Sequence, residues 1–315
     1  ITQYSGAGKS LVVSISPQTD SVMDSNVGGY FGPFLKFCGF DAIEIQGKSD
    51  KEVIIFIDEE SETVQIFEAP LEAIDSHILG EELTEMFAKD EKDKMNVAVV
   101  SAGTAADHSL IGMLNFTFWD PRRKVARLKQ AGRGGIGTVF RDKKIKAIVA
   151  KVKGVKGNLN NVVDLAAITE RGKRFNKEMK DFDDEQCQMR KIGTAHLTNI
   201  MNDYDLFPTH NFKFGSHPDA GNVHSEIYKS LFTQGMPDGC WIGCNMSCAK
   251  SVDNYELQTG PYKGQKVTVD GPEYETAASL GSCAGILAPI SPSKPISTAI
   301  PMEFAPSPGE LFLVL

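Results

Sequence analysis

Three of the six cysteines in this chain stand within nine positions of one another, in the segment GCWIGCNMSCAK. They are Cys240, Cys244 and Cys248, so three residues separate each cysteine from the next. On an ideal helix this spacing gives a single face, but it spreads the sulfur atoms over about 12 Å, which is too far for one metal centre. Two glycines inside the segment allow a loop in which the thiolates converge. The spacing therefore favours a metal or cluster site on a loop.

The number of cysteine ligands indicates which kind of centre that is. Zinc sites usually combine paired Cys or His ligands at short spacing with a second pair downstream, and no matching pair follows here. Three clustered thiolates with one remote ligand are instead typical of [4Fe–4S] proteins. The alternative is that the three cysteines are small buried residues of a helix.

A glycine-rich stretch, AGRGGIG, offers a site for an anion. Gly132, Gly134 and Gly135 surround Arg133, so backbone N–H groups and a guanidinium group share one flexible stretch. This combination suits phosphate or another anion. The stretch lacks the strand-first spacing of a dinucleotide-binding GxGxxG motif. The alternative is a glycine-rich hairpin that carries a solvated arginine.

A second stretch with exposed backbone is SNVGG, nearer the N-terminus. Asn26, Gly28 and Gly29 offer backbone carbonyl and amide groups that no large side chain blocks from a ligand. A turn between two strands explains the same residues equally well.

The stretch SGAGKS resembles a P-loop, but that motif needs a glycine where Gln3 stands. We therefore exclude nucleotide hydrolysis by a P-loop. Lys9, which lies beside small residues in this stretch, is either a ligand for a phosphate or an ordinary surface lysine of a turn.

These residues need a framework, and the first half of the chain is predicted to be rich in strands. Short β-branched runs separated by Gly, Ser or Asp are the signal. The runs are 11–16, 41–47, 52–58, 63–69, 96–103 and 144–152. The segment ILGEELTEMFA is predicted to be a helix, because its apolar residues can share one face.

After residue 152 the pattern changes to helical periodicity. Residues 162–182 predict a strong amphipathic helix, with Asp164 as an acid in its first turn, and residues 194–207 and 224–235 are also helical. The predicted fold class is α+β. Its parts are a β-rich N-terminal domain (1–152), a mostly helical domain (160–286) that carries the cysteines, and an irregular tail (287–315).

Composition narrows the class of protein. The net charge of −8 and the pI near 5.4 argue against a nucleic-acid partner, which would need a basic face. The sequence contains no run of about 18 apolar residues, so no membrane span is predicted. No signal peptide is visible. We expect a cytoplasmic protein whose cysteines are reduced and serve metal or redox chemistry.

Taken in order, the segments SNVGGYFGP, GFDAIEIQGK, QAGRGGIG, KKIKAI, the cysteine cluster and DGPEYET resemble the aldehyde ferredoxin oxidoreductase family. The resemblance covers roughly residues 5–286. It implies an oxidoreductase with a tungsten (or molybdenum) bis-pyranopterin and a [4Fe–4S] cluster. The commonest family pattern has two residues between the first and second cysteines, and here there are three. That spacing is closer to the catalytic subunit of class II benzoyl-CoA reductase, a dearomatising branch of the family.

The resemblance also implies roles for residues of the first domain. The backbone carbonyls of Asn26 and Ala131 would hold a Mg²⁺ ion that bridges the two pterin phosphates. Lys9 stands where the family usually has a phosphate-binding arginine, so the charge is kept but the bidentate geometry is lost. The remaining residues implied to line the pterins are Gly28, Gly29, Gly132, Arg133, Gly134 and Gly135.

In the second domain the resemblance implies that Cys240, Cys244 and Cys248 supply three cluster ligands. Glu273 or Glu275 of GPEYET is the candidate proton-handling carboxylate. His196 and His210 are weaker candidates for a proton donor, and a structural or surface histidine is the alternative for each. The implied partners are ferredoxin or dedicated electron-transfer subunits, in a homo- or hetero-oligomer, and a small-molecule substrate.

The substrate expected from the cysteine spacing is an aromatic acyl-CoA, which would be reduced. The alternatives are oxidation of an aldehyde to a carboxylic acid, and a truncated remnant that binds no cofactor. In the family the fourth cluster cysteine lies far downstream, and none of Cys38, Cys187 and Cys283 matches it. The tail is rich in proline. Codons can be chosen for residues 294–305 that, when read one base earlier, encode a segment similar to the family's sequences. We therefore expect a partial chain with a frameshifted or fragmentary reading frame.

Overall fold

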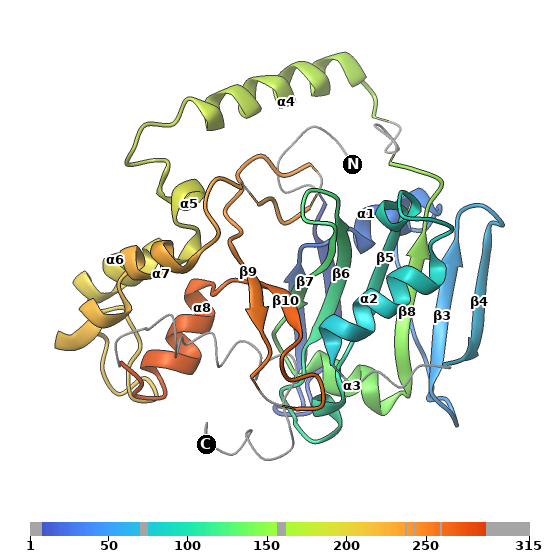
Figure 1. Ribbon diagram of the computed structural model, residues 1–315, viewed down its shortest axis with the longest axis horizontal. Coiled ribbons are helices and arrows are strands. Elements are labelled where there is room, and N and C mark those ends of the chain that lie inside the picture. Colours follow the sequence, from blue (N-terminus) through green and yellow to red (C-terminus); the bar gives the residue numbers. More distant parts are fainter. Residues whose placement is uncertain are drawn as a thin grey trace. The chain divides into compact units, whose positions relative to one another are not determined.

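The structure is a computed structural model, shown in Figure 1. The residues that it describes are 8–69, 75–155, 162–236, 238–241, 243–258 and 260–287. They divide into two compact units. The first contains the residues up to Phe175 together with the segment 241–244, and the second contains the others from Asn176 onward. The predicted tail lies outside the described residues, except for Leu287.

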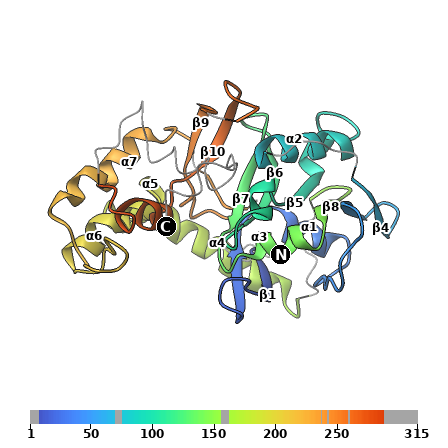
Figure 2. The same cartoon turned by 90° about the horizontal axis from the view of Figure 1, so that it is seen from below.

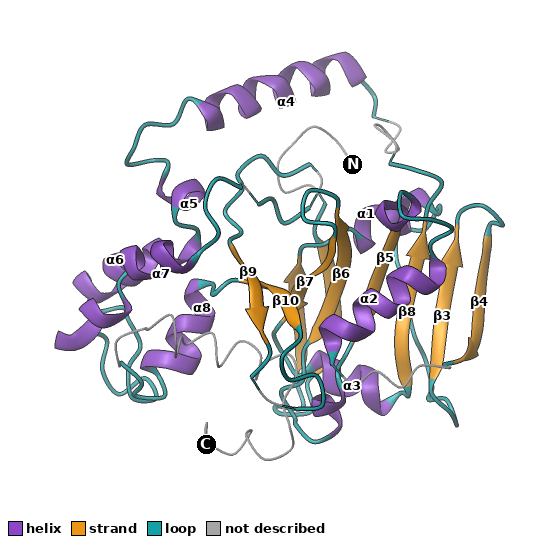
Figure 3. Ribbon diagram, in the orientation of Figure 1, coloured by secondary structure: helices purple, strands orange, loops and turns teal. Residues whose placement is uncertain are grey.

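A six-stranded mixed sheet forms the centre of the first unit, and Figure 3 shows its strands in orange. The strand order is β4-β3-β8-β5-β6-β7, in which only β3 and β8 pair in parallel. The strands are β3 (Val53–Asp58), β4 (Thr63–Glu68), β5 (Val97–Ser101), β6 (Leu114–Asp120), β7 (Val125–Ala131) and β8 (Ile145–Lys151). Every residue of β5 and β6 is buried, as expected for a sheet that is covered on both faces.

Helices cover the two faces of this sheet. They are α1 (Phe31–Phe37), α2 (Ser76–Phe87) and α3 (Ile136–Asp142). Leu79 and Leu83 of α2 share one hydrophobic core with Val99 of β5. The next residue, Val100, belongs to the other core, which contains Phe34 of α1 and residues of α3. Successive strand residues point to opposite faces, so α2 lies on one side and α1 and α3 on the other (Figure 2).

A second, two-stranded sheet belongs to the same unit. It consists of β1 (Ser10–Ile15) and β2 (Val22–Val27), which pair in antiparallel register with Leu11 opposite Asn26. β2 contacts β7 of the large sheet. After β2 the chain passes through Gly28 and Gly29 into α1, so the SNVGG stretch connects a strand to a helix.

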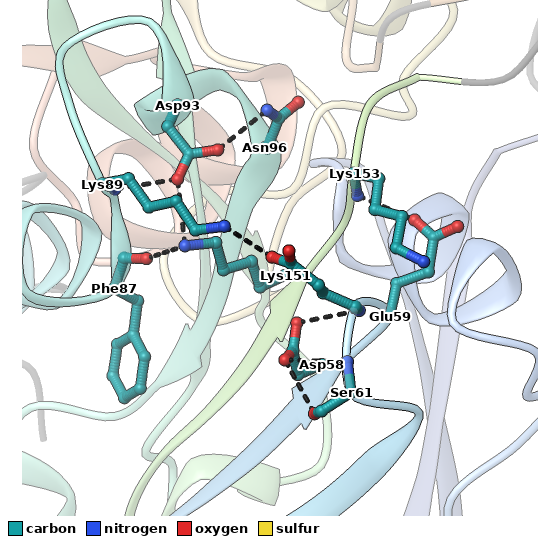
Figure 4. A network of polar contacts seen from close by, with 10 residues as sticks. Asp58, Glu59, Ser61, Phe87, Lys89, Asp93, Asn96, Lys151 and Lys153 are labelled. Carbon is teal, nitrogen blue, oxygen red and sulfur yellow. Dashed lines mark hydrogen bonds and ion pairs between the residues drawn. The ribbon is translucent and has the colours of Figure 1, made fainter.

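Polar side chains connect the ends of β3 and β8 with the end of α2, as Figure 4 shows. The Lys151 ammonium lies 2.9 Å from a carboxylate oxygen of Asp93 and also donates to the carbonyl of Phe87. Lys89 forms an ion pair of 2.5 Å with Glu60. These charged groups border a polar cavity of about 190 Å³. Because opposite charges are paired here, we interpret this network as a structural one that holds the ends of β3, β8 and α2 together.

The second unit consists mainly of short helices with one hairpin. The helices are α5 (Gln188–Lys191), α6 (Leu197–Asp203), α7 (Ser225–Leu231) and α8 (Tyr274–Thr276), which continues as a π-helix (Ala277–Ser282). The hairpin pairs β9 (Ser251–Glu256) with β10 (Lys266–Asp270). Phe207 and Tyr228 are fully buried in the core of this unit.

The remaining elements are one long helix and four 3-10 turns. α4 (Leu165–Lys180) crosses the division between the units. The Asp164 carboxylate accepts a hydrogen bond of 2.9 Å from the backbone N–H of Ala167, as expected for an acid at a helix start. The 3-10 turns are η1 (Asp93–Asn96), η2 (Thr104–Asp107), η3 (Thr194–His196) and η4 (Pro218–Val223). Within the described parts of the chain, no helix has both the length and the apolar character needed to cross a membrane.

The α+β class predicted from the sequence is confirmed, with differences in single elements. Five of the six predicted strands correspond to β1, β3, β4, β5 and β8. The prediction for 41–47 was wrong, because this segment is a mostly exposed loop and no described strand pairs with it. The strands β2, β6, β7, β9 and β10 were not predicted. Polar and charged residues interrupt their apolar pattern, and pairing with neighbouring strands stabilises them nevertheless.

Candidate functional site

The two glycine-bearing stretches of the first unit lie next to each other. The backbone N–H of Arg133 donates a hydrogen bond of 3.3 Å to the hydroxyl of Ser25. Ser25 directly precedes Asn26 on β2, and Ala131 is the last residue of β7. The predicted ligand positions from residues 26–29 and from residues 131–135 therefore meet where these two strands end.

Glycine is required in this loop by its backbone. Gly134 and Gly135 have φ angles of 72° and 63°, which side chains disfavour. A Cβ atom at Gly135 would lie 2.1 Å from the carbonyl oxygen of Leu110. Gly132 differs, since it is exposed and the nearest atom to an added Cβ would be a methyl carbon of Met113 at 4.0 Å. The loop is thus tightly packed on one side and open on the other.

Three exposed polar residues of the first unit offer groups that suit an anion. Arg133 and Lys9 are exposed cations of the first unit, and Asn26 is exposed as well. The Asn26 amide donates to the Asp24 carboxylate at 3.4 Å. Exposed backbone beside a guanidinium group fits a phosphate-bearing ligand. The residues present therefore fit the pterin phosphates that the family resemblance implies.

Trp241, inside the cysteine-rich segment, packs against the stretch that carries Lys9. A Cβ atom on Gly8 would lie 2.3 Å from the indole ring, and one on Gly243 would lie equally close to the far end of that ring. Only 3% of Trp241 is exposed, and among the described residues its indole N–H has no hydrogen-bond acceptor. A buried donor of this kind normally needs a partner. Because Trp241 packs against Gly8, this part of the cysteine-rich segment lies beside the stretch that carries Lys9, a predicted phosphate ligand.

The six cysteines are all reduced, and each is half-buried. The backbone N–H of Cys244 donates to the carbonyl of Trp241 at 3.1 Å, and Cys248 forms an isolated bridge with Asp238. Among the described residues, no three His, Cys, Asp or Glu side chains are grouped closely enough to hold a metal ion. The structure thus describes the local backbone around Cys244 and Cys248.

The two candidate carboxylates lie at the start of α8. Glu273 is half-buried, and its carboxylate accepts a hydrogen bond from the hydroxyl of Thr194. Glu275 is exposed in the first turn of the helix. Burial, together with the negative charges of Glu275 and Cys283, raises the pKa of Tyr274. The two carboxylates therefore have different surroundings although one residue separates them.

The two candidate histidines have local partners. A ring nitrogen of His196 lies 2.9 Å from the carbonyl oxygen of Gly193, within the same turn. His210 is exposed, and its ring stacks on that of His217 with 5.5 Å between the ring centres. These contacts suit structural roles for both side chains, which was the alternative given for each.

Three residues of the site were missed by the reasoning from sequence: Ser25, Thr194 and Trp241. Ser25 and Trp241 stand inside the quoted motifs, and their side chains gain a partner only through folding. Thr194 follows Gly193 in a segment that was assigned to a helix. Gly193, as a common turn residue directly before it, could have drawn attention to this position.

Two family models match this chain. The model of the aldehyde ferredoxin oxidoreductase N-terminal domain matches residues 1–152, and the model of domains 2 and 3 of the same family matches residues 170–293. Together they account for most of the chain. The chain belongs to the aldehyde ferredoxin oxidoreductase family, as its motifs led us to expect.

The relatives that match this chain are longer proteins. The chain is 32% identical over 285 residues to the tungsten-containing aldehyde ferredoxin oxidoreductase of Pyrococcus horikoshii. The matched stretch covers 89% of this chain and 41% of the relative. The corresponding protein of Pyrococcus furiosus is 30% identical, and the match again covers 89% of this chain and 41% of the relative. The WOR-like subunit of an aliphatic sulfonate oxidoreductase from Pyrococcus furiosus is 28% identical, with 92% of this chain and 44% of that protein covered. The chain thus spans about two fifths of the length of these relatives.

A solved structure shares the fold. It is the active site complex BamBC of benzoyl coenzyme A reductase in complex with 1,5-dienoyl-CoA. One of its chains matches with a TM-score of 0.59 and 19% identity, covering 96% of this chain and 43% of that chain. At this identity the similarity concerns the fold alone.

Proposed function

We propose that this chain is the cofactor-binding part of a tungsten (or molybdenum) bis-pyranopterin, [4Fe–4S] oxidoreductase. The observation that carries this proposal is the hydrogen bond between Arg133 and Ser25, because it unites the two stretches on which the predicted phosphate ligands stand. The relatives that are named tungsten-containing support the choice of metal.

The chain's own groups would divide the work as follows. Arg133 and Lys9 bind the phosphate groups of the pterins by charge and hydrogen bonds. The carbonyl oxygens of Asn26 and Ala131 are ligands of the type that Mg²⁺ prefers. The three clustered cysteines supply thiolates for the iron–sulfur cluster. When bound, the metal supplies two-electron chemistry, and the cluster supplies single-electron transfer.

Protons are the part of the reaction that the protein must handle itself. A carboxylate can accept or donate a proton at the substrate, provided that it lies within hydrogen-bond reach. Glu273 and Glu275 are the proposed candidates. Glu275 is exposed, so it can exchange its proton with solvent, whereas Glu273 is held by Thr194.

For the substrate, we favour reduction of an aromatic acyl-CoA, in which two electrons and two protons convert the ring to a diene. Three residues between successive cysteines, as in Cys240 to Cys244, support this branch of the family. Oxidation of an aldehyde, which consumes water and releases two electrons and two protons, is the second candidate. The 30–32% identity to aldehyde ferredoxin oxidoreductases favours it.

Electron partners follow from either reaction. We propose ferredoxin or dedicated electron-transfer subunits, because two electrons must enter or leave one at a time through the cluster. The names of two matched proteins, a WOR-like subunit and a chain of the BamBC complex, support assembly with other subunits. A third candidate is a chain that binds no cofactor.

An anaerobic assay of the purified chain separates these candidates. One reaction contains benzoyl-CoA with a reduced viologen dye, and the other contains an aliphatic aldehyde with the oxidised dye. Dye oxidation that depends on benzoyl-CoA supports the favoured substrate, and dye reduction that depends on aldehyde supports the second. A preparation that contains tungsten and iron but turns over neither compound would refute both substrates.

A further inference from the structure

One turn of the second unit contacts both of the regions in that unit to which the proposed function assigns a role. The turn begins with Gly193 and continues as η3. On one side it lies against the backbone of Cys248, and on the other it meets the start of α8, where Glu273 stands.

The contact with the cysteine segment depends on Gly193. Its φ angle is 83°, and an added Cβ atom would lie 2.7 Å from the carbonyl oxygen of Cys248. The same Cβ atom would lie 2.9 Å from the side chain of Lys250. Neither the backbone angle nor the space admits another residue without a shift. The turn and the Cys248 backbone are therefore in close packing.

The contact with α8 depends on the hydroxyl of Thr194. It accepts a hydrogen bond of 2.9 Å from the backbone N–H of Tyr274 and donates one to the carboxylate of Glu273. A hydroxyl has one hydrogen. The Tyr274 N–H occupies one of the two lone pairs of the oxygen, and the hydroxyl hydrogen is directed to the Glu273 carboxylate. In this arrangement Glu273 is the acceptor of the hydroxyl's hydrogen bond.

We propose that Thr194 is a positioning residue, which fixes the orientation of the Glu273 carboxylate and, through Gly193, keeps it in register with Cys248. The proposal rests on the proposed function, since Glu273 needs a defined orientation only if it acts near the cofactor. It also separates the roles of two neighbouring carboxylates. Glu273 is the oriented acceptor, and the exposed Glu275 is the group that exchanges protons with solvent.

Three variants of the full chain test this proposal. Thr194→Val keeps the shape of the side chain and removes the hydroxyl, and Thr194→Ser keeps the hydroxyl and removes a methyl group. Thr198→Val is the matched control, because Thr198 is 1% exposed and among the described residues its hydroxyl has no partner. The readout is the hydrogen-exchange rate of the Tyr274 amide, measured by NMR, which needs no cofactor.

We expect the Tyr274 amide to exchange at least about tenfold faster in Thr194→Val, as loss of a charge-assisted network predicts. Exchange in Thr194→Ser should stay within about threefold of the wild type, and Thr198→Val should leave it unchanged. An unchanged rate in a folded Thr194→Val variant would overturn the proposal. So would a serine variant that exchanges as fast as the valine variant, and this comparison remains decisive if valine impairs folding.

A second readout concerns the loaded enzyme. Thr194→Val should lower kcat by about 10²-fold with little change in KM, because proton transfer and not substrate binding is affected. Thr194→Ser should restore most of the rate. If the valine variant loses the amide protection but keeps its kcat, the hydrogen bonds exist and the positioning role is refuted. Absence of cofactor in the wild type would refute the proposed function instead, and the exchange result would be unaffected.

Discussion

At the scale of single residues, anion binding by the first unit depends most on Arg133. Arg133 is exposed beside the open backbone of Gly132. Its backbone N–H donates a hydrogen bond to the hydroxyl of Ser25. We predict that Arg133→Ala weakens the binding of inorganic diphosphate by about 10- to 100-fold, the usual worth of hydrogen bonds to charged groups. Titration calorimetry of the folded variant measures this change.

The matched control for this prediction is Arg171→Ala, which removes an equally exposed arginine from α4. It should leave the affinity for diphosphate unchanged. Arg133→Lys should bind with intermediate affinity, because lysine keeps the charge but loses the forked geometry. Equal losses in the Arg133 and Arg171 variants would mean that only the overall charge matters, and the loop would lose its assigned role.

Residue-level reasoning from sequence identified types of group better than their partners. The glycines around Arg133 were singled out because few other residues leave backbone exposed, and the structure shows such open backbone at Gly132 but not at the buried Gly135. The hydrogen bond between Arg133 and Ser25 could not be predicted from the sequence. About a hundred residues separate the two, and only the contact of β2 with β7 brings them together. The hydrogen bond of Glu273 to Thr194 was missed for the same reason.

At the scale of elements, the loop before α3 is predicted to be sensitive to one glycine and tolerant at another. Gly135→Ala places a Cβ atom 2.1 Å from the Leu110 carbonyl in a left-handed backbone. We expect a loss of about 2–5 kcal/mol in the free energy of unfolding, from backbone strain and overpacking. Gly132→Ala, in an open position, should change stability by less than about 0.5 kcal/mol. Urea denaturation of both variants tests the pair, and equal losses would contradict the packing described.

The polar network at the ends of β3, β8 and α2 predicts a dependence of stability on pH. Burial alone would raise the pKa of Asp93, but hydrogen bonds from Asn96 and the Lys89 backbone, with the charge of Lys151, hold it below its ordinary value. A lowered pKa stabilises the fold at neutral pH, and this stabilisation is lost as the pH falls below about 4. Asp93→Asn should therefore cost about 1–2 kcal/mol at pH 7 and less at pH 3 than at pH 7.

The control for the network is Asp184→Asn. Asp184 pairs with Lys191 in a fully solvated position, so its removal should cause no measurable change at either pH. Thermal unfolding at pH 7 and pH 3 gives the comparison. A cost for Asp93→Asn that is the same at both pH values would show that its charge does not contribute.

Elements with a continuous β-branched pattern were predictable, and those that depend on pairing were not. β3 and β8 have buried residues on both faces, so most of their residues are apolar. β7 contains Arg127, Lys129 and Gln130 and is held by its pairing with β6. The wrongly predicted strand at 41–47 shows the reverse case, since its β-branched residues have no neighbouring strand among the described residues.

At the scale of the whole molecule, the family assignment unites the motifs of both units. Neither cysteine spacing nor glycine loops alone define this family, but their order along the chain does, and the two family models match it. The curated relatives are more than twice as long as the matched segment. Cofactor binding by this chain is therefore the claim on which the remaining proposals depend.

The most direct test of that claim is the content of metal, acid-labile sulfide and pterin in the full chain, purified after anaerobic expression. We expect tungsten or molybdenum with pterin, and about four iron and four sulfide per chain, as one [4Fe–4S] cluster requires. Cys244→Ser, as the control, should lose iron and sulfide. Wild-type chain that is folded but contains neither pterin nor iron would contradict the account, and its family membership would then describe ancestry alone.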